Sequence, residues 1–348
     1  MADVTRKNMP YVCIGKSGLK VSKIILGCMS YGSPEWQGWV LDEQTSLEHI
    51  KHAYDLGINA FDTANMYSNG RSEEILGKAI KQFNFNRDEI VVMTKVFGVV
   101  ARGHEQATRG AGQASSELDQ AGYVNQHGLS RKHIFESVEH SLKRLQLDYI
   151  DLFQCHRFDY ETPIEETMQA LHDIVKSGKV RYIGMSSCYA WQFNIMQNYA
   201  IANNLTPFIS MQNHYNLAYR EEEREMLPTL KHFQVGCIPW SPLARGVLTH
   251  PLSQNTKRKE TDPFQNGYGA PATEAVVNRC EEIAKKLGLS MAQVALAWVM
   301  AKADAPIVGT TSLKNLDELV GAVNIKLSEE DIKALEEPYL PRGLFGHS

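Results

Sequence analysis

The sequence predicts a (β/α)8 barrel, an α/β fold in which eight parallel strands alternate with helices. Two observations predict it. Short apolar segments without polar interruptions recur along the whole chain, as expected of strands that are buried on both faces. Segments with the helical spacing of apolar residues separate them. Because no linker or internal repeat divides the 348 residues, we expect one barrel domain over residues 1–348.

The candidate strands are eight short apolar runs. They are Lys23–Gly27, Asn59–Asp62, Ile90–Lys95, Tyr149–His156, Val180–Ser186, Phe208–Gln212, Gly236–Trp240 and Pro306–Gly309. Their alternation with helical segments is the pattern of a TIM barrel. The segment Tyr11–Val21 precedes the first strand and predicts an N-terminal hairpin that caps the barrel.

Capping signals place several helices between the strands. Thr162–Glu165 has the pattern of a capping box with proline at the first helical position, and the helix after it stops at Gly178. Ser290–Gln293 is a second capping box. Thr273–Leu287 predicts an extra helix near the C-terminus.

Two long loops interrupt this rhythm. Phe97–Leu129 is rich in Gly, Ala, Gln and Ser, and Thr249–Ala272 carries the basic run Lys257-Arg258-Lys259. Loops of this length within a compact domain are usually functional or disordered. We expect both on the active-site face of the barrel.

Composition excludes several classes of function. The net charge is -4, from 36 basic and 40 acidic residues, which argues against a nucleic-acid partner. The start lacks the apolar stretch of a signal peptide, and no run of about 18 apolar residues predicts a membrane span. The six cysteines are scattered, which argues against a zinc site or disulfides and predicts a reducing cytoplasm. We expect a monomer or a weak homo-oligomer.

Polar residues stand where the predicted strands end, which is the face that carries chemistry in such a barrel. Three successive strands end with Asp62, Lys95 and His156, and Tyr67 follows in the loop after Asp62. Singly, each has an ordinary structural interpretation, such as a helix cap or a solvated side chain. Together they predict a site.

The four side chains make a chemically coherent set. An ordinary tyrosine, with a pKa of about 10, is a poor proton donor at neutral pH. We expect the Lys95 ammonium to lower the pKa of Tyr67, and Asp62 to hold Lys95 charged and oriented. His156 would orient a carbonyl oxygen, to which Tyr67 gives its proton.

Such a set supplies a proton but no electrons, so reduction requires a hydride donor and implies a nicotinamide cofactor. The dinucleotide fingerprint G-x-G-x-x-G is absent. The nearest approach, Arg109-Gly-Ala-Gly-Gln, lies in a loop and lacks the third glycine. A dinucleotide would therefore bind in another way.

Seven passages resemble the aldo-keto reductase family, in the family's order and over nearly the whole chain. They are Gly57-Ile-Asn-Ala-Phe-Asp62-Thr-Ala-Asn-Met-Tyr67, Met93-Thr-Lys95, Leu152-Phe-Gln-Cys-His156-Arg, Gly178-Lys-Val-Arg-Tyr-Ile-Gly184-Met-Ser-Ser, Gln212-Asn-His-Tyr-Asn, Trp240-Ser-Pro-Leu243 and Pro306-Ile-Val-Gly309-Thr-Thr. The chain is most similar to fungal aryl-alcohol dehydrogenase-like reductases, which also have a short tail such as Pro338-Tyr-Leu-Pro.

The resemblance implies NADPH bound across the strand ends, with Asp62, Tyr67, Lys95 and His156 as a catalytic tetrad. It implies that Ser186, Ser187 and Gln212 hold the carboxamide and that Trp240 stacks on the nicotinamide, although a plain core tryptophan is the alternative. The implied contacts to the rest of the cofactor are Ser241, Pro242, Leu243, Arg245, Gly246, Lys257, Arg258, Gly309, Thr311, Asn315 and Glu318.

Three positions depart from the family pattern. Ser187 stands where Asn is frequent, Thr311 where many members have Arg, and Leu319 where many have Asn. The last two weaken the site for the adenosine phosphate. The prediction of NADPH over NADH is thus weaker than that of nicotinamide binding.

Aromatic side chains in the loops suggest a flat or aromatic aldehyde as substrate. They are Trp36, Trp39, Phe97, Tyr123 and Trp191, and packing at the rim of the barrel is the alternative for each. An alternative function is a nucleotide-binding or redox-sensing subunit like those of potassium channels. The complete tetrad favours the enzyme. A metal-dependent hydrolase needs a His-x-His pair at a strand end, and the sequence has none.

Overall fold

The computed structural model describes residues 8–106, 113–254, 262–269, 271–344 and 346–347, and it is the predicted (β/α)8 barrel. Eight parallel strands follow one another in the order β10-β3-β4-β5-β6-β7-β8-β9. A hydrogen bond from the Ile307 amide to the Pro239 carbonyl, 2.9 Å long, joins the two ends of this sheet. The strands are β3 Ile25–Gly27, β4 Ala60–Asp62, β5 Val91–Val96, β6 Ile150–Cys155, β7 Val180–Ser186, β8 Ser210–Gln212, β9 Gly236–Cys237 and β10 Ile307–Val308.

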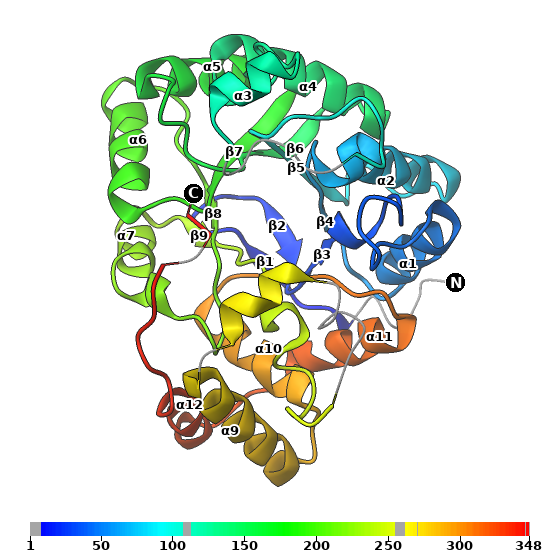
Figure 1. The fold of residues 1–348 in the computed structure, drawn as a ribbon, viewed down its shortest axis with the longest axis vertical. Coiled ribbons are helices and arrows are strands. Elements are labelled where there is room, and N and C mark those ends of the chain that lie inside the picture. Colours follow the sequence, from blue (N-terminus) through cyan, green and yellow to red (C-terminus); the bar gives the residue numbers. More distant parts are fainter. Residues whose placement is uncertain (1–7, 107–112, 255–261, 270, 345, 348) are drawn as a thin grey trace.

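Helices surround the strands as a ring, seen along the barrel in Figure 1. Those that follow β3 to β10 along the chain cover the outer face of the sheet. The helices are α1 Glu43–Asp55, α2 Arg71–Gln82, α3 Ser115–Gln120, α4 Arg131–Leu145, α5 Ile164–Lys176, α6 Ala190–Ala202, α7 Met226–Phe233, α9 Pro271–Leu287, α10 Met291–Lys302, α11 Leu313–Gly321 and α12 Glu329–Glu336.

Each of the eight predicted strand segments contains an observed strand, but several strands are shorter. The run predicted over Gly236–Trp240 forms ladder pairs only at Gly236 and Cys237. Pro239 has no amide hydrogen to donate, and Trp240 rejoins the sheet through a single bridge to His214. The short strands still hold the sheet in register.

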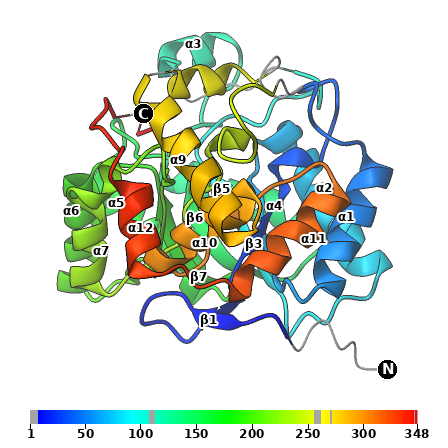
Figure 2. The same cartoon turned by 90° about the horizontal axis from the view of Figure 1, so that it is seen from below.

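The predicted N-terminal hairpin is confirmed as β1 Tyr11–Cys13 paired antiparallel with β2 Lys20–Ser22. Ile14 and Val21 are fully buried among the side chains inside the barrel. Figure 2 shows β1 at the opposite end of the molecule from α3 and the C-terminal tail. The hairpin therefore closes the floor of the barrel and leaves the carboxyl ends of the strands as the open face.

The two capping boxes have different outcomes. Ser290 and Gln293 cap α10 reciprocally, as predicted. The prediction at Thr162 is wrong, because α5 begins at Ile164 with Pro163 at its N-cap and no side-chain cap. The Thr162 hydroxyl instead donates to Asp159 Oδ2 at 2.7 Å, and this carboxylate organises the preceding turn.

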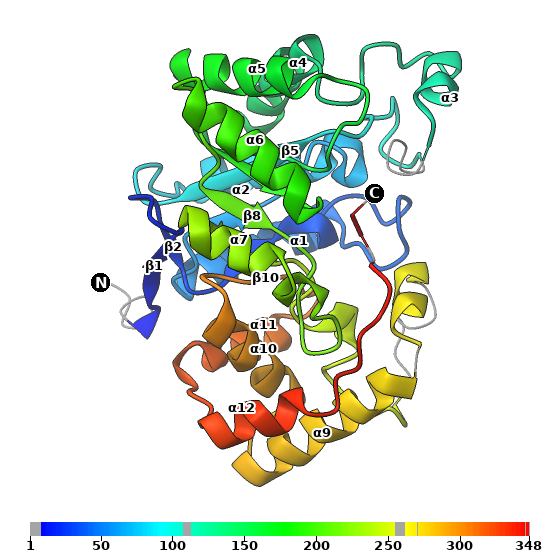
Figure 3. The same cartoon turned by 90° about the vertical axis from the view of Figure 1, so that its left-hand side faces the viewer.

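The extra helix near the C-terminus is confirmed as α9, which begins two residues before the predicted Thr273. It lies beside α12 outside the barrel (Figure 3), where Arg279 Nη1 donates to the Ala334 carbonyl at 2.8 Å. Among the described residues, no single helix is long and apolar enough to cross a membrane; α9 and α10 pass such a test only as a pair bent by 101°.

The first long loop is partly ordered by a small core of its own. It contains α3, and Val99, Ala101, Leu118 and Tyr123 bury their side chains against one another. In the second long loop the structure describes a 3-10 helix at Pro263–Tyr268. Most of the glycine-containing run that starts at Arg109 lies outside the described residues, as do Lys257 and Arg258.

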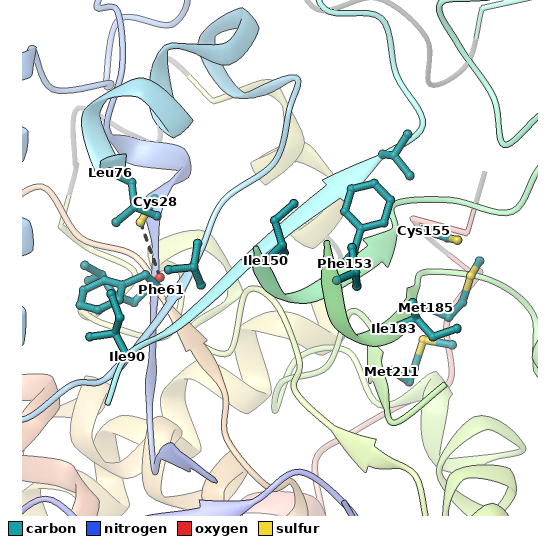
Figure 4. Close-up of a cluster of buried hydrophobic side chains, with 14 of the residues drawn as sticks. Cys28, Phe61, Leu76, Ile90, Ile150, Phe153, Cys155, Ile183, Met185 and Met211 are labelled. Carbon is teal, nitrogen blue, oxygen red and sulfur yellow. Dashed lines mark hydrogen bonds between the residues drawn. The ribbon is translucent and has the colours of Figure 1, made fainter. Parts of the chain in front are cut away.

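The main hydrophobic core lies between the strands and the ring of helices. Side chains such as Phe61 on β4, Phe153 on β6 and Met211 on β8 belong to this layer (Figure 4). A second, smaller group fills the inside of the barrel near its floor, and the hairpin belongs to it. All six cysteines are free thiols, and all but Cys13 are buried.

Candidate active site

Every second side chain of a barrel strand points inward, and the site consists of such inward-facing residues. Ala60, Met93 and Leu152 fill the inside of the barrel, and the next inward residue on each strand stands two positions further toward the carboxyl end. These next residues are polar and almost fully buried: Asp62, Lys95 and Gln154, joined by Gln212 on β8. The layer above the apolar floor is thus a polar layer.

Lys95 and Asp62 form the ion pair at the centre of this layer. Lys95 Nζ lies 2.6 Å from Asp62 Oδ2 and donates to the Thr63 carbonyl at 2.8 Å. The side chains are 0% and 3% exposed. Burial lowers the pKa of Lys95, but Asp62 and Tyr67 outweigh it, and the net pKa is raised above its ordinary value. Lys95 therefore stays an ammonium and Asp62 holds it in place.

Tyr67 stands over Lys95 at the start of a 3-10 turn, Tyr67–Gly70. Its hydroxyl is 3.4 Å from Lys95 Nζ. The next residues, Ser68 and Asn69, have positive φ angles of 46° and 48°, which ordinary residues adopt only when their surroundings impose them. Asn69 supplies that constraint, since its amide donates to the Gly103 and Gln106 carbonyls and its Oδ1 accepts from the Ala101 amide. These hydrogen bonds attach the turn Tyr67–Gly70 to the first long loop, Phe97–Leu129.

The expected lowering of the Tyr67 pKa is wrong as a net effect. Burial raises the pKa of Tyr67; Lys95 lowers it, as anticipated, but Asp62 raises it again, and the net pKa lies above the ordinary value. Desolvation of the phenolate outweighs the ammonium here. Lys95 nevertheless stabilises negative charge that develops on the hydroxyl when its proton leaves.

His156 follows β6 and completes the group. Its ring meets the Tyr67 ring edge-on, with 5.9 Å between the centroids and 81° between the planes. Burial, reinforced by the positive charges of Arg157 and Lys95, holds the pKa of His156 well below its ordinary value. The imidazole is therefore neutral at physiological pH and can donate one hydrogen bond to a substrate oxygen.

These pKa directions predict the pH profile of carbonyl reduction. A proton donor works below its pKa and is lost as the pH rises through it, and the neutral His156 is lost only at acid pH. We expect kcat/KM for an aldehyde to be flat from about pH 6.5 to about pH 10, because the ordinary values of both groups are shifted outward. Initial rates across this range test the expectation; an inflection near pH 8 would contradict it.

A second group of side chains lies beside the tetrad on β7, β8 and the segment after β9. Ser186 donates to the Gln212 carbonyl at 2.7 Å, and Trp240 Nε1 donates to Ser187 Oγ at 2.9 Å. His214 stacks on one face of Trp240, with 4.2 Å between the centroids and 10° between the planes. Trp240 is thus half-buried and held by Ser187 and His214, and we call its ring the platform.

Asp62 also orients Gln212, because a carboxylate can only accept. Gln212 Nε2 donates to Asp62 Oδ1 at 2.9 Å and to Gln154 Oε1 at 2.9 Å. Both hydrogens of the side-chain Nε2 are therefore used in hydrogen bonds to buried residues. Gln212 Oε1 accepts from no described residue and is left for a donor such as a carboxamide.

The segment after Trp240 has the backbone shape of an anion-binding nest. Ser241, Ala244, Arg245 and Gly246 all have positive φ angles, of 52°, 50°, 55° and 100°. Leu243, with a φ of -104°, precedes the left-handed Ala244, and a right-handed residue followed by a left-handed one turns successive amides toward one side, which suits a pyrophosphate. The Ala244 and Gly246 amides already donate to the Ser241 and Leu243 carbonyls within the turn. The guanidinium of Arg245 is 2.7 Å from the buried carboxylate of Asp262, so this side chain braces the turn.

The remaining predicted cofactor residues fall in two places. Pro242 and Leu243 belong to the same turn as the nest. Gly309, Thr311, Asn315 and Glu318 lie in the loop after β10 and on α11. Leu319, one of the departures from the family pattern, is buried against the core. Lys257 and Arg258 lie outside the described residues.

Comparison with known proteins decides the family. The sequence model of the aldo/keto reductase family matches residues 23–339, which is most of the chain. The chain belongs to the aldo/keto reductase family. It is an oxidoreductase of the aryl-alcohol dehydrogenase-like kind that acts on carbonyl groups, and the family uses a nicotinamide dinucleotide.

Three similar relatives span nearly the full length of this aldo/keto reductase. A versiconal hemiacetal acetate reductase of Aspergillus parasiticus is 50% identical over 97% of this chain and 98% of its own. A protein named as an aryl-alcohol dehydrogenase in Schizosaccharomyces pombe is 51% identical over 95% of this chain and 96% of its own. An aldo-keto reductase of Alternaria alternata is 45% identical over 97% and 94%.

The five aromatic residues that were predicted to line the substrate pocket do not all lie in positions that fit this role. Trp36 and Trp39 lie half-buried in the loop after β3, and Phe97 lines a cavity with the first long loop. Trp191 is 54% exposed on α6. Tyr123 is only 5% exposed and packs in the small core of the first long loop, so the structure does not support it as a wall of the pocket.

The sequence prediction missed the C-terminal tail as part of this face. The His347 ring stacks on Tyr189 at 5.2 Å, and its Nε2 lies 2.9 Å from the buried Glu222 Oε1. A Cβ added to Gly346 would lie 3.0 Å from the Trp240 ring. The tail therefore reaches the platform residue, and nothing in its sequence signals this contact.

Gln154 is a second residue that was missed. It joins the two halves of the site, since its Nε2 donates to Asp62 Oδ1 at 3.1 Å while its Oε1 accepts from Gln212. A polar residue inside a mostly apolar strand was the available signal, since only Asp151 and Gln154 are polar between Ile150 and Cys155. Gln154→Leu should lower kcat/KM for the cofactor about tenfold or more, because hydrogen bonds to a charged group are lost and Gln212 is freed. Gln169→Leu, on the exposed face of α5, is the control, and equal kinetics of the two variants would refute the role.

Proposed function

We propose that this reductase uses NADPH to reduce aldehydes and ketones to alcohols, reversibly, with Tyr67 as the proton donor. One observation carries the proposal. A buried ammonium, Lys95, contacts both the Asp62 carboxylate and the Tyr67 hydroxyl, with a neutral imidazole, His156, against the tyrosine ring. This arrangement supplies what carbonyl reduction needs besides hydride.

The residues beside the tetrad fit a nicotinamide dinucleotide. Gln212 Oε1 accepts from no described residue and is available as an acceptor for a carboxamide, and Ser186 donates to the Gln212 carbonyl. Trp240 is the aromatic platform, and the positive-φ turn at 241–246 offers amides to a pyrophosphate. The bound cofactor supplies the hydride. We assign the adenosine phosphate to Arg258 and Lys257, because a guanidinium suits phosphate.

In the mechanism that we propose, the side chains of this chain handle the proton. His156, as a neutral donor, and Tyr67 bind the carbonyl oxygen and fix its position. As negative charge develops on that oxygen, Tyr67 gives up its hydroxyl proton. Lys95 stabilises the phenolate that is left, and Asp62 keeps Lys95 charged. In the reverse reaction, alcohol oxidation, the Tyr67 phenolate takes the proton of the alcohol hydroxyl.

We propose aromatic or other bulky aldehydes as substrates. Trp36, Trp39 and Phe97 are the half-buried aromatic candidates near the open face. Relatives named for a hemiacetal acetate and for aryl alcohols support the assignment. The test compares kcat/KM for 4-nitrobenzaldehyde and for butanal, each with NADPH and with NADH. We expect the aromatic aldehyde to be preferred by about tenfold or more, as one good apolar contact provides. We expect a preference of about the same size for NADPH over NADH, because the adenosine phosphate would accept charged hydrogen bonds. Equal rates for both aldehydes would refute the substrate class.

A further inference from the structure

Arg157 stands directly after His156, at the mouth of the proposed site. The residue is half-buried, and its Nη1 donates to the His156 carbonyl at 2.6 Å. Its Nε is buried without a hydrogen-bond partner, and its Nη2 donates to no described residue. Two of the three nitrogens of the guanidinium are therefore without an acceptor among the described residues.

Arg157 differs from the other half-buried arginines in what its guanidinium contacts. Arg87, Arg144, Arg220 and Arg245 each pair with a carboxylate, at 2.8, 2.6, 2.8 and 2.7 Å. Across the described ranges of the chain, no carboxylate lies within 4.0 Å of the Arg157 guanidinium. Arg342 also lacks a carboxylate partner among the described residues, but its Nη1 and Nη2 donate to the Ala218 and Gly267 carbonyls. A half-buried cation without a counter-ion is costly, whereas a bound anion would offset that cost.

The surroundings of the guanidinium place it at the reacting end of the site. Its positive charge acts on Tyr67, on His156 and on the buried Cys188 that follows β7. Two of these are the groups that would hold the carbonyl oxygen. The turn at 241–246, which we propose for the pyrophosphate, follows β9, which lies three strands away from β6 in the sheet.

We propose that Arg157 binds a carboxylate of the substrate, so that the preferred substrates are aldehydes or ketones that carry a carboxylate near the reacting carbonyl. A carboxylate presents two oxygens in the plane and at the spacing of two guanidinium donors. A bound carboxylate would accept a hydrogen bond from Nη2. It would also supply the negative counter-charge that the guanidinium lacks among the described residues. The inference rests on the proposed function and specifies its substrate class.

The test compares each carboxybenzaldehyde isomer with its methyl ester, which removes the charge and keeps the aldehyde. The measured quantity is the ratio of kcat/KM for the acid to kcat/KM for the ester, and the isomer with the highest ratio is used. We expect Arg157→Met to lower this ratio about 10-fold to 100-fold, the scale of a hydrogen bond to a charged group. Comparing variants cancels the intrinsic reactivity of the two aldehydes.

Two further variants make the result specific. Arg131→Met removes an exposed cation at the start of α4, and we expect it to leave the ratio unchanged. Arg157→Lys keeps the charge without the planar fork and should give an intermediate ratio; it carries the test if Arg157→Met does not fold. An unchanged ratio with Arg157 substituted, while the ester is still reduced, overturns this inference alone. No reduction of either compound by the unsubstituted protein overturns the proposed function as well.

Discussion

Tyr67→Phe is expected to lower kcat for aldehyde reduction about 10²–10⁴-fold or more and to leave the affinity for NADPH nearly unchanged. The hydroxyl that is lost is the one 3.4 Å from Lys95 Nζ, and the ring that remains keeps its edge-on contact with His156. The fall therefore reflects proton transfer rather than collapse of the site. Steady-state kinetics and titration of NADPH fluorescence measure the two quantities.

The matched control for Tyr67→Phe is Tyr54→Phe. Tyr54 uses its hydroxyl far from the strand ends, where it accepts from the Asn86 amide at 3.3 Å. We expect near-normal turnover from this variant. If Tyr67→Phe also retained near-normal turnover, another group would have to protonate the carbonyl oxygen, and the assignment of the donor would be wrong.

Lys95→Met is expected to abolish measurable turnover and to lower the free energy of unfolding by about 3–5 kcal/mol. Methionine matches the length of the lysine stem but leaves the Asp62 carboxylate buried at 3% exposure without its counter-ion. Gln154 and Gln212 still donate to that carboxylate, but they carry no charge. Denaturant titration followed by circular dichroism measures the loss of stability.

A double variant separates the two effects of Lys95. Adding Asp62→Asn to Lys95→Met removes the stranded charge, so most of the lost stability should return while activity stays absent. The test is the same denaturant titration on both variants and on Asp62→Asn alone. If the double variant were no more stable than Lys95→Met, the cost would not come from an uncompensated carboxylate.

Much of the fold follows from local patterns that the sequence displays. A strand such as Val180–Ser186 is largely apolar, because most of its positions are buried, and its bounds were predicted as observed; Arg181, near its start, is exposed. The cap at Thr162 was mispredicted because the competing partner, Asp159, comes from a turn that only the folded loop defines. Caps depend on tertiary contacts that a four-residue pattern does not contain.

The sequence predicted those residues of the candidate site that lie at the ends of strands. Asp62, Lys95 and Gln212 fall at inward positions that the period of the strands dictates. The net pKa of Tyr67 was not predictable, because it is a balance between burial and two opposite charges whose distances the sequence does not give. The proposed role of Arg157 was not predictable either. It depends on the absence of a hydrogen-bond partner for Nε among the described residues, which only the folded chain shows.

The most direct test of the central claim is label transfer from NADPH that carries deuterium at the reactive carbon of the nicotinamide. With 4-nitrobenzaldehyde, we predict one alcohol for each NADPH consumed, with deuterium at the former carbonyl carbon. Under the same conditions Tyr67→Phe should bind the cofactor and form almost no product. Tight binding of NADPH with no reduction of any carbonyl compound would contradict the account and indicate a nucleotide-binding subunit instead.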